Sequence, residues 1–401
     1  MRKLAPWRVW AEPTVLIPRF EGERKRGALD WPAHTATIVG MNNNVMIAMS
    51  GGVDSSVAAC LLVCGNLNCC GVTMKLFGND DAGLDREDVC CSAGDAEDAR
   101  SVARKLGIPH FVFNLSRDFD ELVIRRFVDT YLSGGTPNPC IDCNRRVKFE
   151  RLLRRAREAG YDRIATGHYA RAERSPGGRH ILMKALDETK DQSYVLYSMT
   201  QDQLARTLLP LGGMRKHEVR EIARAHGLRN SAKPDSQDIC FVREGTYADF
   251  IERRSGRGSE PGDFVGTDGS VIGRHRGLVR YTIGQRRGLG VGFSRRMYVC
   301  GKDTARNTVT LGGESELYSK WLHANEINLV ACDSLDRPMR VTARTRYRQS
   351  EQPAVLEQVG ADIIRVEFDE PVRSAAPGQA VVLYDGDVVV AGGTIIETGQ
   401  P

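Results

Sequence analysis

Three cysteines stand in polar segments that are marked by proline, where a thiol could do chemistry. Cys140 and Cys143 lie three residues apart in TPNPCIDCNRR, and Cys240 ends the segment PDSQDIC. Both segments carry cationic neighbours, including Lys148 and Lys233. Cations lower the pKa of a thiol, and the thiolate is the nucleophilic form. We therefore predict two loop-like segments that present reactive thiols.

Other uses of these thiols are weaker on the sequence alone. A structural zinc site needs a fourth ligand and usually a second CxxC pair, and the chain has none. A thioredoxin-like dithiol would leave the glycine-rich loop described next without a purpose. The eleven cysteines show no disulfide-like framework, which predicts a reducing, cytoplasmic location. We interpret Cys60 and Cys64, four apart on a predicted helix, as core packing.

The segment MIAMSGGVDSSVAACLL, residues 46–62, predicts a nucleotide loop. An apolar strand runs into Ser-Gly-Gly, and a helix starts near Asp54. Glycines let the backbone approach a phosphate, and the helix start aims N–H groups at the same point. Asp54 could hold Mg²⁺ beside the phosphates. No Walker GxxxxGK[ST] pattern is present, and SGGVDSS instead resembles the PP-loop of ATP pyrophosphatases.

Two further strands would end beside this loop. Ligands collect at the carboxyl edge of a parallel sheet. Met74 in TMKLF could face an adenine there, although a plain core role remains open. Gly167 in ATGHY would leave room for a nucleotide, and His168 would point from the same edge.

Strand and helix patterns alternate from residue 45 and give way to short strands after about residue 245. The fold class predicted is α/β: a parallel-sheet PP-loop domain of the adenine nucleotide hydrolase-like, Rossmann type, then a small central domain and a C-terminal β-barrel. The expected divisions are a disordered extension at 1–43, the ATP-binding catalytic domain at 44–248, a β-rich central domain at 249–305, and the barrel at 306–401.

Charge and hydropathy limit the classes of partner that the chain can bind. The net charge of +5 permits a nucleic acid, and no apolar run is long enough to span a membrane. Between Gly269 and Cys300 seven arginines occur without an acidic residue. In RVTARTRYR the arginines at even positions share one face of a strand, opposite Val341 and Ala343. These patterns indicate contact with RNA phosphates.

The chain resembles the bacterial tRNA-specific 2-thiouridylases of the MnmA type from about residue 45 to about residue 398. The resemblance rests on motifs that occur in order: AMSGGVDSS, TPNPCIDCNRRVKF, ATGHYAR, KDQSYVLY, DSQDICF, YTIGQRRGLG, ARTRYRQ and APGQAVVLYDGD. It implies a tRNA-uridine 2-sulfurtransferase. Such an enzyme uses ATP to adenylate the C2 oxygen of the wobble uridine, replaces that oxygen with sulfur, and releases AMP and pyrophosphate.

The resemblance also implies roles for residues at matching positions. Cys240 would carry the persulfide, and Cys143 would release its sulfur by forming a disulfide with it. ATP would be held by Ala48, Met49, Ser50, Gly51, Gly52, Val53, Asp54, Ser55, Met74 and Gly167. The target base would lie against Asn138, Pro139 and Cys140. Further contacts with tRNA would come from His168, Lys190, Asp191, Gln192, Arg346, Tyr347 and Gln379. The implied partners are the tRNAs for Lys, Glu and Gln, and a cysteine desulfurase or sulfur-relay protein.

The chain departs from some relatives at Cys140, where an aspartate is proposed to assist proton transfer. A thiol here puts that role in doubt. Cys140, Cys143 and Cys240 could instead ligate an iron–sulfur cluster, which would serve the same thiolation. Another PP-loop adenylating ligase or amidotransferase is the remaining alternative, and it would need no paired cysteines.

Overall fold

The structure is a computed structural model that describes residues 43–77, 93–234, 239–242, 245–256 and 259–400. The predicted extension at 1–43 lies almost entirely outside the described residues. Positions 235–238, in the polar part of the segment before Cys240, also lie outside them.

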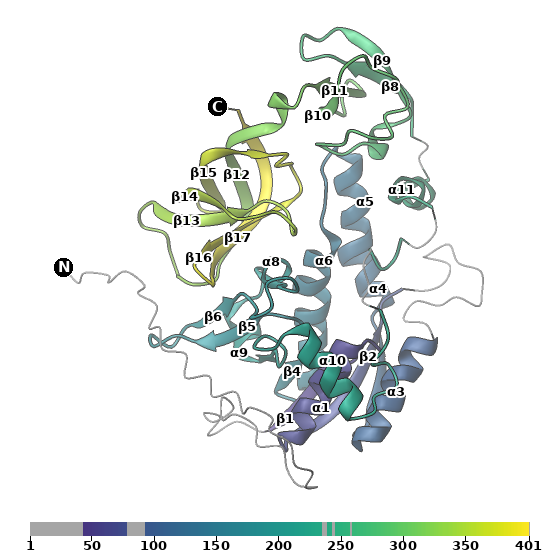
Figure 1. Ribbon diagram of the computed structural model, residues 1–401, viewed down its shortest axis with the longest axis vertical. Helices are drawn as coiled ribbons and strands as arrows, with labels where there is room; N and C mark the ends of the chain where they lie inside the picture. Colours follow the sequence, from purple (N-terminus) through teal and green to yellow (C-terminus); the bar gives the residue numbers. More distant parts are fainter. Residues whose placement is uncertain (1–42, 78–92, 235–238, 243–244, 257–258, 401) are drawn as a thin grey trace, which may run out of the picture.

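A five-stranded parallel sheet forms the first part of the molecule (Figure 1). Its order is β3-β2-β1-β4-β7. The strands are β1 (Asn44–Ala48), β2 (Asn68–Lys75), β3 (His110–Asn114), β4 (Arg163–Ala165) and β7 (Thr207–Leu208). Every neighbouring pair is parallel. The predicted parallel-sheet fold is therefore confirmed.

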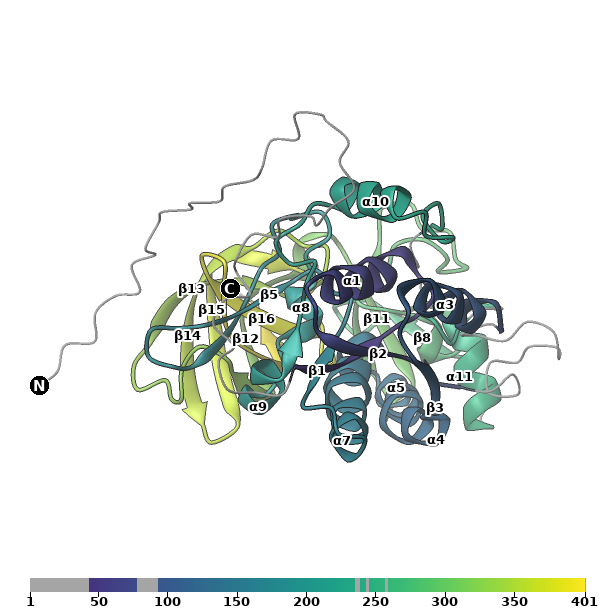
Figure 2. The same ribbon diagram turned by 90° about the horizontal axis from the view of Figure 1, so that it is seen from below.

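Helices cover both faces of this sheet, as the view from below shows (Figure 2). Alternate strand residues point to opposite faces. Val45 and Ile47 of β1 pack into a cluster with helices on one face, and Met46 packs into a different cluster on the other. The first face carries α1 (Val53–Cys64), α3 (Ala93–Leu106) and α10 (Lys216–Ala225). The second carries α4 (Ser116–Phe119), α5 (Arg125–Leu132) and α7 (Leu152–Glu158). Helix α6 (Pro139–Asp142) belongs to the same face, because its Ile141 shares the cluster of Met46.

Cys140 and Cys143 lie in a helix, so the expectation of a loop-like segment is wrong for them. Helix α6 runs directly into a π-helical segment, Cys143–Arg151, and then into α7. The Asn138 side chain caps the start by accepting a hydrogen bond from the Cys140 N–H at 3.1 Å. Pro139 occupies the first turn, where its missing N–H costs nothing. The residues that suggested a turn are therefore a helix start.

The central part is a small mixed sheet in the order β10-β11-β8-β9. Its strands are β8 (Gly262–Val265), β9 (Val271–His275), β10 (Tyr298–Asp303) and β11 (Thr308–Gly312), and helix α11 (Tyr247–Ser255) precedes them. Phe264, Tyr281 and Val299 lie in its own core cluster. This sheet includes β11 and so extends a few residues beyond position 305.

The last six strands close into an antiparallel barrel, which confirms the predicted β-barrel. The order is β12-β15-β14-β13-β16-β17, and β12 also pairs with β17. The strands are β12 (Tyr318–Leu329), β13 (Met339–Arg344), β14 (Gln352–Gly360), β15 (Ile363–Arg373), β16 (Ala380–Asp385) and β17 (Val388–Gly399). The hairpin of β5 (Arg171–Arg174) and β6 (His180–Met183) extends this sheet where Met183 meets Val388. Strand pairing between β6 and β17 therefore joins the barrel to the first domain.

Two short helices, α8 (Ser193–Leu196) and α9 (Gln201–Ala205), follow the hairpin. In β13 the predicted alternation holds, because Val341 and Ala343 are buried while Arg340 is exposed. The strand ends at Arg344, so Arg346 and Tyr347 lie on the turn that follows. Among the described residues, no helix is both long and apolar enough to cross a membrane.

Candidate active site

The loop between β1 and α1 presents an open helix start. Gly51 has a φ of +75°, and a Cβ on it would lie 2.3 Å from the Asp95 carbonyl oxygen. Gly52 is the residue that precedes α1, and no side chain caps the helix there. The Ser55 and Ser56 hydroxyls donate to the Gly52 carbonyl at 3.1 and 3.0 Å. A helix start without a side-chain cap aims N–H donors at an anion, and a polyphosphate fits this cradle.

A segment that precedes Cys240 makes hydrogen bonds with the nucleotide loop. The Asn230 side chain donates to the Gly51 carbonyl at 2.9 Å and to the Ser56 hydroxyl at 2.8 Å. The Lys233 ammonium pairs with Asp95 and, at 2.9 Å, with Asp98 of α3. Lys233 therefore anchors this segment to α3, in addition to standing near Cys240 in the sequence. The chain that leads to Cys240 is fastened to the nucleotide loop.

Asp54, the predicted magnesium ligand, is held by two residues that sequence reasoning missed. The Lys216 ammonium donates to its two carboxylate oxygens at 2.7 and 2.8 Å. The Tyr169 hydroxyl donates to Oδ1 at 2.9 Å. Tyr169 belongs to the ATGHY motif, but Lys216 lies far along the chain in no recognised pattern. The magnesium role of Asp54 stays a prediction, and a metal ion there would have to share or replace the ammonium.

The residues from β2 and β4 that were predicted to lie beside the nucleotide are at the carboxyl ends of those strands. Met74 is half-buried near the end of β2. A Cβ on Gly167 would lie 2.6 Å from the Ser55 backbone nitrogen, so glycine is what lets this loop reach the start of α1. The His168 ring bonds the Thr166 hydroxyl at 2.7 Å. Burial, with a contribution from Lys148, holds the pKa of His168 well below its ordinary value, so the ring is neutral.

The two distant cysteine segments meet at the same edge of the sheet. Cys143 is 7% exposed and belongs to a cluster with Phe77, which follows β2, and Leu115, which follows β3. Phe241, the neighbour of Cys240 in the chain, is in that cluster too. Cys240 itself is exposed. Helix α6 and the Cys240 segment therefore converge beside the carboxyl ends of β2 and β3, at the same edge of the sheet as the nucleotide loop that follows β1.

The exposed Cys140 lies near residues of both the first domain and the barrel. Neighbouring protein atoms shield the thiol from water and raise the pKa of Cys140, and Lys148 opposes that rise. Burial also raises the pKa of Tyr347, with Asp191 and then Cys140 among the groups that act on it. The Tyr347 ring lies 6.0 Å from that of Tyr194, centroid to centroid. We call the group of Cys140, Lys148, His168 and Tyr347 the Cys140 recess.

Within the described part of the chain, the three proposed cluster ligands do not lie close enough to share a single metal ion. Among the described residues, the only three Cys, His or acidic side chains whose ligand atoms all lie within 4.8 Å of one another are Cys60, Cys64 and His226. Cys140 is exposed and Cys143 is buried. An iron–sulfur cluster on Cys140, Cys143 and Cys240 stays a prediction.

Several residues expected to touch tRNA instead have partners within the protein. The buried Asp191 carboxylate accepts hydrogen bonds from the Ser193 hydroxyl at 2.8 Å and from Arg344 at 3.2 Å. Gln192 accepts from the Tyr169 N–H at 2.8 Å. These bonds hold the KDQ turn, which Lys190 begins, between the barrel and the nucleotide site.

Arg346 and Gln379 also stand at junctions. One Arg346 nitrogen donates to the Ile283 carbonyl of the central part at 3.0 Å and to the Ser374 carbonyl of the barrel at 2.8 Å. Burial lowers the pKa of Arg346. The Gln379 Oε1 atom is buried without a hydrogen-bond partner within the described residues. Contact of these residues with tRNA stays a prediction.

An ion-pair network that sequence reasoning missed seals the barrel against α5 and α6. Arg126 pairs with Asp142 at 3.1 Å and with Glu326 of β12. The Thr394 hydroxyl also donates to Glu326, at 3.1 Å. Burial raises the pKa of Asp142 to about 6, and Arg126 and Arg146 oppose the rise. Asn138 and Pro137 line a small cavity beside this network.

The arginine-rich part of the central domain is mostly open to solvent. Exposed side chains are those of Arg274, Arg276, Arg286, Arg287, Arg295 and Arg296. Arg280 differs, because it pairs with Glu252 at 2.7 Å and with Asp249 at 3.2 Å on α11. The expectation that the seven arginines suit phosphate contacts stays a prediction, and Arg280 is the one whose charge two acidic residues on α11 already balance.

The sheet order, the uncapped glycine loop and the convergent strand ends define a parallel-sheet domain of the PP-loop type, joined to a central domain and a β-barrel. Three family models match along the chain. They are described as the tRNA methyl transferase HUP domain at residues 43–244, the tRNA methyl transferase PRC-barrel domain at 248–313, and the aminomethyltransferase beta-barrel domain at 319–395.

Curated relatives match nearly the whole described chain. A tRNA-specific 2-thiouridylase MnmA from Clostridioides difficile is 48% identical over 356 residues, which cover 88% of this chain and 98% of that protein. The one from Moorella thermoacetica is 49% identical over 356 residues, covering 88% of this chain and all of that protein (100%). The chain belongs to the family of tRNA-specific 2-thiouridylases.

Proposed function

We propose that this protein is a tRNA-uridine 2-sulfurtransferase that uses ATP to replace the C2 oxygen of a wobble uridine with sulfur. The observation that carries the proposal is the convergence of Cys143 and the Cys240 segment on the sheet edge that holds the PP-loop. Family membership supports the same reaction. The fold brings an adenylating loop and two thiols to one edge, as this chemistry requires.

ATP binds with its phosphates on the loop from Ala48 to Ser55. The start of α1 supplies N–H donors, and the Lys216 ammonium beside Asp54 neutralises charge that develops on the phosphates. Magnesium, where Asp54 helps to hold it, would add positive charge at the same place. The uridine O2 attacks the α-phosphorus, the bond to the β-phosphate breaks, and pyrophosphate leaves.

Sulfur transfer follows on the adenylated base. The outer sulfur of a persulfide on Cys240 attacks C2, and AMP departs with the former O2. The Cys143 thiolate attacks the inner sulfur of Cys240, which breaks the bond to the transferred sulfur and leaves a Cys143–Cys240 disulfide. A thiol reductant then restores both cysteines, and a cysteine desulfurase or sulfur-relay protein reloads Cys240. A reducing cytoplasm suits this cycle.

The Cys140 recess receives the base. A wobble uridine must leave the anticodon stack to reach the strand ends, and an aromatic side chain such as that of Tyr347 can stack on it. His168 is neutral, so one of its ring nitrogens donates a hydrogen bond and the other accepts one. The exposed arginines of the central domain supply phosphate contacts that do not depend on sequence. The substrate class is therefore tRNA, with those for Lys, Glu and Gln expected from the family.

The test uses the full chain with unmodified tRNA, ATP, Mg²⁺, a cysteine desulfurase and cysteine. We expect AMP, pyrophosphate and 2-thiouridine in equal amounts. Cys240→Ser and Cys143→Ser should each abolish 2-thiouridine, while Cys332→Ser, away from the site, should leave its formation unchanged.

Thiolation that persists in either Cys143→Ser or Cys240→Ser would overturn the persulfide route. Adenylation of a small carboxylate without any need for tRNA would point to a ligase of the same superfamily instead. Anaerobic purification with iron analysis separates the cluster-dependent variant. If thiolation requires iron, and Cys140→Ser loses that iron, the cluster-dependent mechanism would replace the persulfide mechanism.

A further inference from the structure

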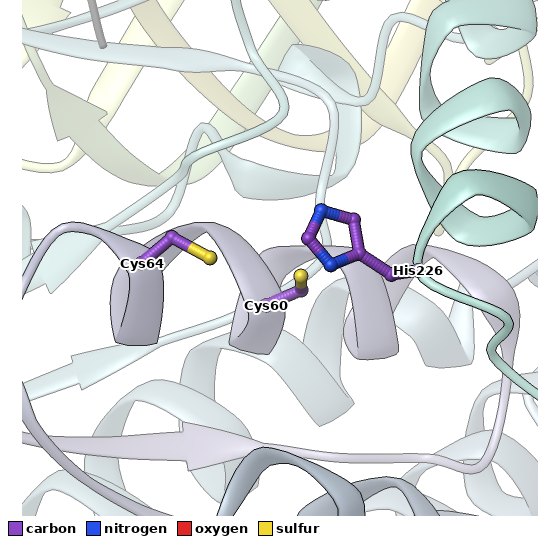
Figure 3. A group of neighbouring side chains, drawn as sticks. All are labelled: Cys60, Cys64 and His226. Atoms are coloured by element: carbon purple, nitrogen blue, oxygen red, sulfur yellow. The ribbon is translucent and has the colours of Figure 1, made fainter. Parts of the chain in front are cut away.

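Cys60, Cys64 and His226 form a cluster of metal-ligating side chains outside the proposed active site. One ligand atom from each lies within 4.8 Å of the others. Figure 3 shows the His226 ring turned toward the Cys60 sulfur, with the Cys64 sulfur one turn further along α1. The sequence indicated only core packing for the two cysteines, because His226 lies more than 160 positions away in the chain.

The helices dictate this arrangement. Residues four apart on a helix lie on the same side, one turn above the other. Cys60 and Cys64 occupy that relation on α1, and His226 directly follows the last residue of α10. Helix α10 packs beside α1 through Val219 and Ala223, which share a cluster with Val57 and Ala58. Two thiols from one helix therefore face one imidazole from its neighbour.

The chemistry of these three side chains indicates which cation they would bind. Two thiolates and an imidazole are the ligands that zinc prefers, and sites with three protein ligands keep a fourth position for water. Zinc bonds of about 2.3 Å to sulfur and about 2.0 Å to nitrogen would place the ligand atoms about 3.5–3.8 Å apart, which is compatible with ligand atoms that lie within 4.8 Å of one another. Carboxylates do not take part, which disfavours magnesium and calcium.

Exposure suits a site that opens to solvent on one side. Cys60 is fully buried at 0%, whereas Cys64 is exposed and His226 is half-buried. Burial and the neighbouring Cys64 raise the pKa of Cys60 to about 12, so without a cation this residue stays a thiol. Each thiol would release its proton to solvent as the metal binds. A cation can enter along the Cys64 side.

We propose that Cys60, Cys64 and His226 form a zinc site that clamps the carboxyl ends of α1 and α10 together. The two helices run side by side in the same direction, because Asp54 and Lys216 pair near their starts while the cluster joins their ends. A bound zinc ion would fix the second end of this helix pair. With three protein ligands and water in the fourth position, the ion would hold the spacing between Asp54 and Lys216 at the nucleotide loop.

The test measures metal binding directly and needs neither ATP nor tRNA. The full chain carrying Cys140→Ser, Cys143→Ser and Cys240→Ser removes the thiols of the active site as competing ligands. Under anaerobic, reducing conditions it is titrated with Co²⁺ as a spectroscopic probe for zinc. We expect one equivalent to give thiolate-to-cobalt absorption and the intense visible bands of a tetrahedral ion, and Zn²⁺ to displace it.

Further substitutions in this background locate the ion. Cys64→Ser and His226→Gln should each weaken Co²⁺ binding by at least about tenfold, a lower limit taken from the loss of supporting residues around metal ligands. The increase in melting temperature with Zn²⁺ should disappear in the double variant. Cys332→Ser, on a half-buried cysteine elsewhere, should change neither result.

Cys64 is exposed, so its replacement by serine is expected to fold, and melting in the presence of a chelator verifies this. The absence of thiolate-to-cobalt absorption would overturn the proposal. Absorption that persists unchanged in both Cys64→Ser and His226→Gln would overturn it equally, since the ion would then lie elsewhere.

Discussion

The nucleotide loop and the Cys140 recess are assembled in different ways. The loop is one continuous strand, turn and helix, and its main supports, Asn230 and Lys216, act on a shape that the local sequence already favours. The recess combines a helix start, the end of β4 and the turn after β13. Cys140 and Tyr347 are separated by about two hundred positions in the chain.

Because of this difference, we expect damage to the two regions to have different effects on the enzyme. Damage at the loop should remove adenylation without affecting how the domains dock. Damage at the contacts between barrel and helices should misplace Tyr347 and leave the loop intact. The Arg344–Asp191 pair and the network around Glu326 are the contacts that hold the recess together. The predictions that follow separate the two regions.

The largest effect is expected at Lys216. Lys216→Met removes the ammonium that pairs with Asp54 beside the phosphate loop. Groups that stabilise developing charge are worth about 10²–10³ in rate, so pyrophosphate release in the presence of tRNA should fall by that factor. Lys320→Met, whose ammonium donates to the Asp369 carbonyl on the barrel, is the matched control. An undiminished rate in Lys216→Met would remove this lysine from the phosphate site.

A smaller effect is expected in the Cys140 recess. Tyr347→Ala removes an exposed aromatic ring that lies beside Cys140. Stacking of a base on an aromatic ring is worth about 1–3 kcal/mol, so kcat/KM for tRNA should fall by about 5- to 150-fold. Tyr347→Phe keeps the ring and should retain most activity. Equal losses in both variants would assign the effect to the hydroxyl instead of to stacking.

The docking of the barrel should respond to Glu326. Glu326→Gln weakens the pairing with Arg126 in a partly buried network, and we expect a loss of about 1–2 kcal/mol in the free energy of unfolding. Urea denaturation measures it. Glu367→Gln breaks an exposed pair with Arg365 on the barrel surface and should cost less than about 0.5 kcal/mol. Equal losses would show that the network does not hold the domains.

The smallest effects are expected on the arginine-rich surface. Arg286→Gln or Arg287→Gln should weaken tRNA binding a few-fold, and each should reduce the slope of log affinity against log salt by about 0.7–0.9. Arg280→Gln should leave the slope unchanged, because Glu252 and Asp249 already balance that charge. A filter-binding series over several salt concentrations measures all three. A reduced slope for Arg280→Gln would mean that it leaves its acidic partners for the RNA.

The sequence by itself determined the local parts of this protein. Val45 to Ile47, the Ser-Gly-Gly turn and the helix from Val53 are adjacent in the chain, so hydropathy and glycine placement were enough to predict the nucleotide loop. The same holds for the parallel sheet and the barrel, whose strands carry regular patterns. One local prediction was wrong, because Asn138 and Pro139 suit a helix start as well as a turn.

Only the tertiary structure decided which distant residues meet. No local pattern links Lys216 to Asp54, Glu326 to Arg126, or His226 to Cys60. The tertiary structure also distinguished Arg280 from the exposed arginines. In the sequence, all of these arginines look the same. The physical reason is that pairing and burial depend on how layers pack. Periodicity reports only whether a residue faces its own core, so it cannot show which partner lies across the interface.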